Sequence, residues 1–202
     1  MKKFVTILSA ALLLLAGTNA FAQMSVGAGY LSSTETVKSG SSSTDRTPLN
    51  GFYAGVSYTV PIASGINFTP GIYYGLAAKS NATSIFGLQI EGKQQDSFIN
   101  VPLHFSFGAE LGSGLRCFVY GGPSASFAVA SKVISGSTTY DRLKDNDSLQ
   151  RFDLMLGGGV GLEINDIVRF QVGYDFGMLN RTDSENFLVR RNQLTAGVAF
   201  LF

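Results

Sequence analysis

The only histidine of the 202-residue chain, His104, lies two residues before Ser106. Side chains alternate between the two faces of an extended strand, so this spacing places both residues on one face. A histidine that accepts the proton of a serine hydroxyl is the centre of nucleophilic acyl transfer, provided that an acid orients the histidine. The pair is therefore a candidate for hydrolysis, and the alternative is that His104 is a hydrogen-bonded interior residue. We favour the second interpretation.

Two other patterns that can indicate chemistry are weak here. The glycine run Gly157–Gly161 is not followed by the Lys-Ser/Thr pair or the helix of a phosphate-binding loop. Cys117 is the only cysteine, which excludes an intramolecular disulfide and a cysteine-rich metal site. No spacing of metal ligands is present. We therefore predict no catalytic, cofactor or metal-binding residues and no enzymatic activity.

Charged residues recur at alternate positions between apolar residues, which predicts one charged and one apolar face. If Ile164 pairs with Val168 across the turn at 164–167, then Glu163 lies directly opposite Arg169, a cross-strand pair of opposite sign. Charges confined away from bulk water must be paired. We predict a structural charge network made of Arg116, Asp153, Glu163, Arg169, Asp175 and Arg191. Further polar candidates for the same face are Lys79, Asn100, His104 and Gln171.

Strands that alternate in this way must carry these residues. The clearest alternation covers 97–108, 152–163, 168–178 and 193–202, and weaker versions cover 24–30, 52–60 and 66–76. Each has about the 9 to 11 residues that a tilted transmembrane strand requires. Segment 115–131 is ambiguous, because Arg116 suits an interior whereas its same-face neighbours Phe118 and Tyr120 suit lipid. These segments predict an all-β fold, an eight-stranded antiparallel transmembrane β-barrel.

The two ends of the chain agree with export to a membrane. Lys2 and Lys3 precede an apolar stretch of roughly a dozen residues and a small-x-small motif at 20–22, the pattern of a secretory signal peptide. The stretch is shorter than the ~20 residues of a spanning helix. We predict a signal peptide at 1–22 and a barrel domain at 23–202, whose last residue, Phe202, is an assembly signal for bacterial outer-membrane insertion.

The lengths of the predicted connections alternate. Long connections at about 32–48, 79–95, 132–150 and 180–189 are separated by short ones at 61–65, 109–114 and 164–167. Short periplasmic turns and longer extracellular loops are typical of outer-membrane barrels, which places both termini in the periplasm. The polar segment 32–45 is expected to be a mobile loop. The charged segment 140–147 is expected to be a solvated loop, with contact to a divalent cation or to lipopolysaccharide as the alternative.

The composition excludes some partners and fits a barrel. Without Lys2 and Lys3 the chain has 13 basic and 14 acidic residues, so its balance does not favour nucleic acid. Glycine accounts for 24 residues. This frequency is unfavourable in helices but suits curved strands and crowded barrel interiors. The expected partners are outer-membrane lipids, lipopolysaccharide and, through the C-terminal strand, the barrel-assembly machinery, and the expected state is a monomer.

Several short motifs resemble one family. The segment 97–103, with its Val-Pro-Leu core, is similar to a strand of the outer membrane protein beta-barrel domain family, small bacterial barrels often labelled porin-family. The motifs at 120–123, 152–161 and 174–178 resemble the Ala-Gly-Pro strand, the glycine-rich strand and the Tyr-x-x-Gly-Leu segment of that family. The resemblance covers 97–202 well and the first half only by pattern. It implies architecture and location, because the family shares no established reaction.

The sequence leaves four function classes to compare. We predict a non-enzymatic outer-membrane barrel with a side-chain-filled interior, which contributes to envelope structure or makes surface contacts through its loops. A narrow channel or transporter for ions or small apolar molecules is the alternative. A lipid-modifying enzyme is less favoured, although His104 and Ser106 resemble the His-x-Ser of an outer-membrane lipid A deacylase. A soluble lipocalin-like binder would require the apolar face of each strand to point inward.

Overall fold

A computed structural model describes residues 22–39, 42–45, 48–85, 88–135, 138–143, 150–182 and 188–202. The predicted signal peptide at 1–22 therefore lies almost entirely outside the described residues. All of the regular structure in the described part is β-strand. The strands are β1 (Gln23–Ser39), β2 (Ser42–Asp45), β3 (Leu49–Ala63), β4 (Ile66–Ile85), β5 (Leu88–Gly112), β6 (Leu115–Ser135), β7 (Thr138–Asp141), β8 (Phe152–Ile164), β9 (Val168–Gly177) and β10 (Leu188–Leu201).

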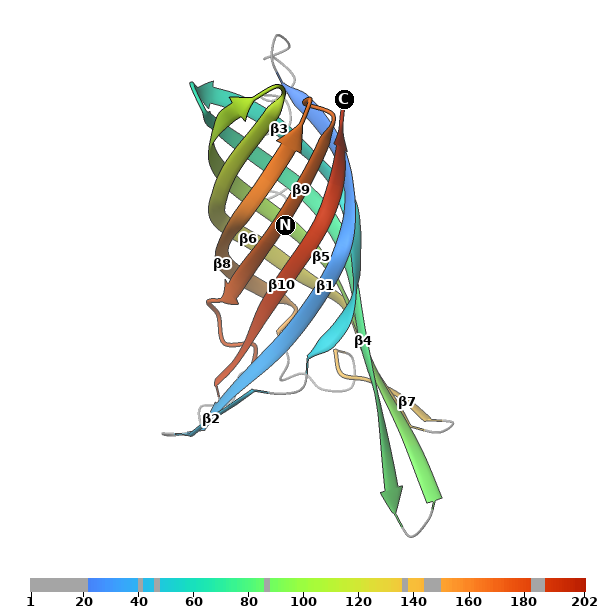
Figure 1. Cartoon of the computed structure of the whole chain (residues 1–202). Coiled ribbons are helices and arrows are strands. Elements are labelled where there is room, and N and C mark those ends of the chain that lie inside the picture. Colours follow the sequence, from blue (N-terminus) through green and yellow to red (C-terminus); the bar gives the residue numbers. More distant parts are fainter. Residues whose placement is uncertain are drawn as a thin grey trace, which may run out of the picture.

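Eight of these strands form a closed ring of antiparallel neighbours (Figure 1). The order around the ring is β1, β3, β4, β5, β6, β8, β9 and β10, and β10 pairs with β1 to close it. The short strands β2 and β7 pair only with β1 and β6. The predicted eight-stranded barrel is confirmed. Closure leaves no free sheet edge within the ring, so every backbone group there can be paired.

The faces of the strands lie as the alternation predicts. Large apolar side chains are exposed on the outside, among them Phe105 on β5, Val160 on β8 and Phe170 on β9. The residues between them, such as Ser106, Glu163 and Arg169, are buried inside the ring. The lipocalin-like alternative, which needs the reverse arrangement, is wrong. Across the described residues we find no helix with the length and apolarity needed to cross a membrane.

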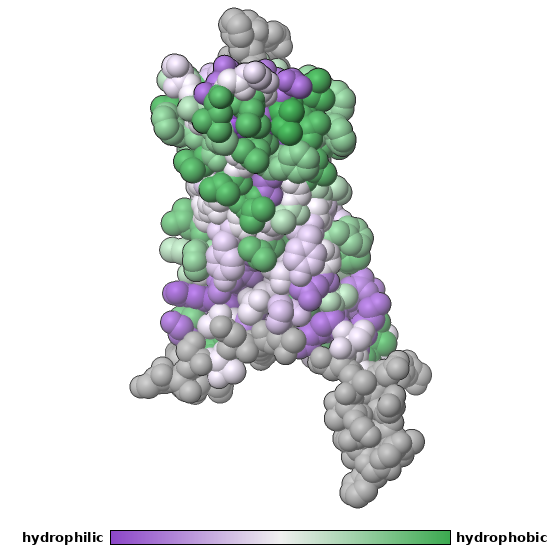
Figure 2. Space-filling view, in the orientation of Figure 1, coloured by the Kyte–Doolittle hydropathy of each residue, from purple (hydrophilic) through white to green (hydrophobic). Residues whose placement is uncertain are grey.

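The outer apolar surface does not cover the whole length of the strands. In Figure 2 hydrophobic residues are densest toward the end of the barrel that carries the turns, and the surface toward the loop end is more polar. β5 has 25 residues. This is more than twice the roughly 9 to 11 residues that cross a bilayer. The strands therefore continue well beyond the apolar belt at the loop end.

All four predicted long connections contain strand, the last one only at its end, where β10 begins at Leu188, so those predicted boundaries are wrong. β4 and β5 continue as a paired hairpin from Lys79↔Gln94 to Ile85↔Leu88, which projects from the ring in Figure 1. β1 includes residues 32–39, and β6 continues to Ser135. Apolar alternation marks only the part of a strand that faces lipid, whereas a polar segment pairs equally well outside the membrane.

The short turns lie within the predicted connections at 61–65, 109–114 and 164–167, but the first two are shorter than predicted, because β3 continues to Ala63 and β5 to Gly112. The connections at 64–65, 113–114 and 165–167 join β3 to β4, β5 to β6 and β8 to β9. Ser113, Asn165 and Asp166 adopt positive φ angles of 50°, 52° and 55°. Small and Asx residues tolerate this left-handed region best. These tight turns hold the register that sets the interior contacts.

Candidate functional site in the barrel interior

The structure places all six residues of the predicted charge network inside the ring. Five of them are buried, and the sixth, Arg116, keeps 14% of its side chain exposed. Together with polar and aromatic neighbours they form three levels along the barrel axis: a cluster near the turns, a central cavity and a cluster near the loops. The network members are Arg116, Asp153, Glu163, Arg169, Asp175 and Arg191.

The turn-end cluster is centred on Glu163. The register pairs Glu163 with Arg169 across the β8–β9 turn, as the sequence predicts, and with Arg116 on β6. Glu163 Oε1 lies 2.6 Å from Arg169 Nη2, and Glu163 Oε2 lies 2.7 Å from Arg116 Nη1. Both guanidinium groups lie 5.6 Å from the centre of the Phe118 ring. One carboxylate therefore joins three neighbouring strands.

This cluster also decides the ambiguous strand. Arg116, Phe118 and Tyr120 share one face of β6, and that face points inward, while Val119 is exposed on the lipid side. The two aromatic rings lie 6.1 Å apart. Aromatic rings belong in this interior because arginine stacks favourably on their faces. The sequence alone does not show that Arg116 lies against the Phe118 ring. It therefore did not determine which face of β6 points inward.

The loop-end cluster contains residues that the sequence analysis missed. Glu35 is buried and lies 3.0 Å from Arg181 Nη1 and 3.8 Å from Arg142 Nη2. All three were assigned to predicted loops. A signal for Glu35 existed, because Leu31, Ser33 and Glu35 continue the inward positions of β1. The expectation of a mobile loop over 32–45 is wrong for its first half, where Ser33 and Glu35 are buried in strand.

Arg191 forms the second part of the loop-end cluster. Its Nε lies 3.7 Å from Asp153 Oδ2, and its guanidinium lies 4.3 Å from the centre of the Phe98 ring. Arg191 also donates a hydrogen bond to Ser126 Oγ. Phe98 is almost completely buried. Arginine side chains thus lie against an aromatic ring at both ends of the interior.

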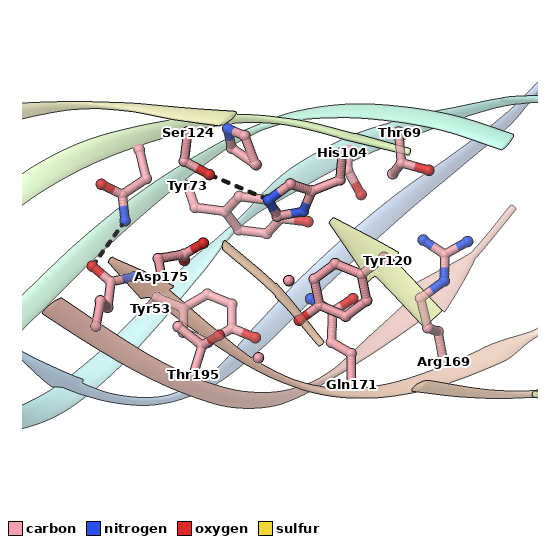
Figure 3. A pocket seen from close by; sticks show the side chains of 16 residues that line it. Tyr53, Thr69, Tyr73, His104, Tyr120, Ser124, Arg169, Gln171, Asp175 and Thr195 are labelled. Carbon is pink, nitrogen blue, oxygen red and sulfur yellow. Dashed lines mark hydrogen bonds between the residues drawn. The ribbon is translucent and has the colours of Figure 1, made fainter. Parts of the chain in front are cut away.

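A cavity of about 70 Å³ lies between the two clusters (Figure 3). His104 Nε2 shares a hydrogen bond of 3.2 Å with Ser124 Oγ, and Asn100 Nδ2 donates to Gln193 Oε1 at 3.3 Å. Figure 3 shows Arg169 toward one end of the labelled group and Asp175 toward the other. The lining residues are Tyr53, Ser57, Thr69, Tyr73, Asn100, Pro102, His104, Tyr120, Ser124, Gly158, Arg169, Gln171, Gly173, Asp175, Gln193 and Thr195.

The geometry around the single histidine differs from that of a hydrolase. His104 and Ser106 share the inner face as expected, but the hydrogen bond of His104 is made with Ser124. The His104 ring also lies 5.1 Å from the ring of Tyr120. In the described part of the chain, no carboxylate is hydrogen-bonded to His104 and no cluster of three His, Cys, Asp or Glu residues could hold a metal ion.

Glycines make room for the interior aromatic rings. A Cβ at Gly173 would overlap the Tyr120 hydroxyl, one at Gly197 the Tyr53 hydroxyl, and one at Gly75 the ring of Phe98. Glycine within a strand marks a place where another group approaches closely. The glycine-rich pattern therefore has a packing reason: each ring lies over a neighbouring strand where no side chain stands in its way.

Solved structures of several small barrels are similar to this chain. The attachment invasion locus protein Ail of Yersinia pestis, in complex with the heparin analogue sucrose octasulfate, is 14% identical, with coverage of 90% of this chain and 99% of Ail and a TM-score of 0.48. Neisserial surface protein A is 16% identical, with 90% and 97% coverage and a TM-score of 0.46. The outer membrane enzyme PagL is 11% identical, with 85% and 98% coverage and a TM-score of 0.40.

No curated protein sequence matches the chain. A family model, in contrast, matches residues 17–183, which is most of the chain and includes the first half that the sequence motifs covered only by pattern. The closed ring, the apolar outer face and the polar interior agree with this match. The chain belongs to the outer membrane protein beta-barrel domain family.

Proposed function

We propose that the protein is a non-enzymatic outer-membrane barrel with a side-chain-filled interior, which supports the envelope and makes surface contacts through its loop-end hairpins. The observation that carries this proposal is the joint contact of Glu163 with Arg116 and Arg169. These ion pairs connect β6, β8 and β9 across the interior. An eight-stranded barrel has an interior just wide enough for side chains to fill.

We further propose that the turns and both termini face the periplasm and that the loops face outward. This orientation is supported by the difference in length between the tight turns and the extended hairpins. In this orientation the β4–β5 hairpin lies outside the cell. Beyond Ala78, β4 pairs with β5 and no longer with β3. Lipids and lipopolysaccharide would surround the belt, the assembly machinery would recognise β10, and the barrel would be a monomer.

The absence of catalysis is part of this proposal. PagL is an outer membrane enzyme, so a small barrel alone does not exclude catalysis. Here the only histidine is hydrogen-bonded to Ser124 inside the barrel, away from the lipid-facing surface. A lipid substrate would have to enter the interior to reach it. We expect variants His104→Ala and Ser106→Ala to leave the lipid A profile of the producing cells unchanged.

A narrow channel is the second candidate, and the central cavity is the observation that favours it. Conductance in planar bilayers distinguishes the two functions. We expect the wild-type barrel to give no stable conductance steps, whereas a Glu163→Ala/Phe118→Ala variant, which removes the centre of the turn-end cluster, gives small steps. The matched control is Glu110→Ala, which changes an exposed carboxylate. Stable conductance steps of uniform size from the wild-type barrel would overturn the proposal that side chains fill the interior.

A further inference from the structure

Among the buried carboxylates of the described residues, Asp175 is the one that the ion pairs leave out. It is 8% exposed and lines the central cavity. In the described part of the chain Glu35, Asp153 and Glu163 each have an arginine within 4.0 Å, and Asp175 has none. A carboxylate confined in a membrane-embedded interior requires a compensating partner. The cavity beside Asp175 is the open space in which a contact partner could bind.

Asn100 supplies a second, independent indication of a ligand. It is 7% exposed, it lines the same cavity, and its Oδ1 has no hydrogen-bond partner. Its Nδ2 is already used, because it donates to Gln193 Oε1. Gln193 lies directly opposite Asp175 in the β9–β10 register. The vacant acceptor of Asn100 and the unpaired carboxylate of Asp175 therefore lie on either side of Gln193.

The walls of the cavity also favour a cation. Tyr53, Tyr73 and Tyr120 all line it, and the first two rings meet edge to face with centres 5.6 Å apart. Aromatic faces carry negative electrostatic potential and attract cations, notably ammonium groups. A volume of about 70 Å³ exceeds the roughly 10 to 15 Å³ that one water occupies on this measure. The space is therefore large enough for a small ion together with a few waters.

The arginines near the cavity determine which end the ion occupies. Arg169 lines the cavity but is held by Glu163 at 2.6 Å and donates to Thr59 Oγ1 at 3.2 Å. Because Arg116 shares the same glutamate, the turn-end cluster carries a net positive charge and repels a cation. Arg191 attracts Asp175 at longer range from the loop side, but its nearest partners are Asp153 and Ser126. The end of the cavity at Asp175 is thus the favourable position.

We propose that the central cavity is a binding site for a monovalent cation of ammonium or potassium size, held by the carboxylate of Asp175, Oδ1 of Asn100 and the tyrosine rings. Oxygen donors and a single negative charge suit a monovalent ion. The bound ion gives the Asp175 carboxylate a counter-ion in direct contact, and the site does not depend on whether the barrel conducts.

Crystallography with thallium(I), a heavy mimic of both ions, tests the site directly. Crystals of the wild-type barrel refolded in thallium acetate are expected to show an anomalous difference peak in the cavity, in contact with Asp175. The Asp175→Asn barrel, treated in the same way, is expected to lose this peak and to keep any peaks at the surface. A wild-type cavity that contains only water would overturn the proposal.

Unfolding in urea gives a second readout in solution. We expect the wild-type barrel in detergent to unfold at higher urea in ammonium chloride than in the same concentration of N-methyl-D-glucamine hydrochloride, whose sugar-bearing cation is much larger than ammonium or potassium. Asp175→Asn is expected to lose this difference, and the control Glu110→Gln to keep it. An equal wild-type midpoint in the two salts would contradict the proposal, even if Asp175→Asn fails to fold.

Discussion

The hydroxyl of Tyr120 on β6 lies over Gly173 on β9, two strands away in the ring, at the place where a Cβ of residue 173 would stand. A strand with a side chain at that position could not accommodate the ring. Tyr120 in turn lines the central cavity and stacks beside His104. A residue with no side chain therefore determines where the aromatic wall of the interior lies.

Replacing Gly173 by Ala should lower the free energy of unfolding, because the new methyl group would displace Tyr120. Overpacking of this kind costs about 1 to 3 kcal/mol. Urea unfolding in detergent measures the change. Gly121→Ala is the matched control, since the nearest atom to a Cβ there is a backbone oxygen at 3.2 Å. An equal loss in both variants would show that Tyr120 does not limit the space at 173.

Replacing Glu163 by Ala should destabilise the barrel more than any single change of an exposed carboxylate. The substitution leaves Arg169 and Arg116 without their carboxylate inside the ring. Breaking a buried pair by removing one partner costs about 3 to 5 kcal/mol. Urea midpoints of Glu163→Ala and the control Glu110→Ala provide the comparison. Similar midpoints would mean that the turn-end cluster contributes little to stability.

Changing Phe202 to Ser should reduce the amount of assembled barrel while export across the inner membrane continues. The Phe202 side chain is 73% exposed, and its backbone N–H donates to Met24 O at 2.8 Å, so the substitution removes the ring but keeps this hydrogen bond. Quantifying heat-modifiable protein in outer-membrane fractions measures assembly. Phe107→Ser, an exposed aromatic at the turn end of another strand, is the control. Equal assembly of both variants would remove the special role of the terminal residue.

The closed ring should make the purified protein migrate differently on SDS gels before and after boiling. β10 pairs with β1 over residues 188–201, so no edge is left from which detergent can begin to unfold the sheet. The substitution Gly197→Pro removes a backbone hydrogen-bond donor in the middle of the β1–β10 pairing. It should therefore abolish the band of the folded protein. A single band at one position under both conditions, with a helical circular dichroism spectrum, would exclude the barrel.

The sequence by itself determined which residues share a strand face, where the short turns lie and six of the charges that line the interior. Successive side chains of a strand point to opposite faces, so a strand between lipid and the barrel interior alternates apolar and polar residues. This alternation is visible in the sequence of a single strand. The Glu163–Arg169 pair was predictable for the same reason, because a four-residue turn fixes its register. The family motifs extended this local information to the order of the strands.

Only the tertiary structure decided where the strands end, which way β6 faces and which interior groups meet. The polar halves of β4 and β5 have no lipid to select apolar residues, so their pairing leaves no period in hydrophobicity. Arg116 meets Glu163 across strands 47 residues apart, and Glu35 meets Arg181 across 146. Arg116 and Glu163 meet because β6 and β8 are neighbours in the ring, whereas Glu35 and Arg181 meet only after β1 has paired with β10. No local pattern encodes either contact.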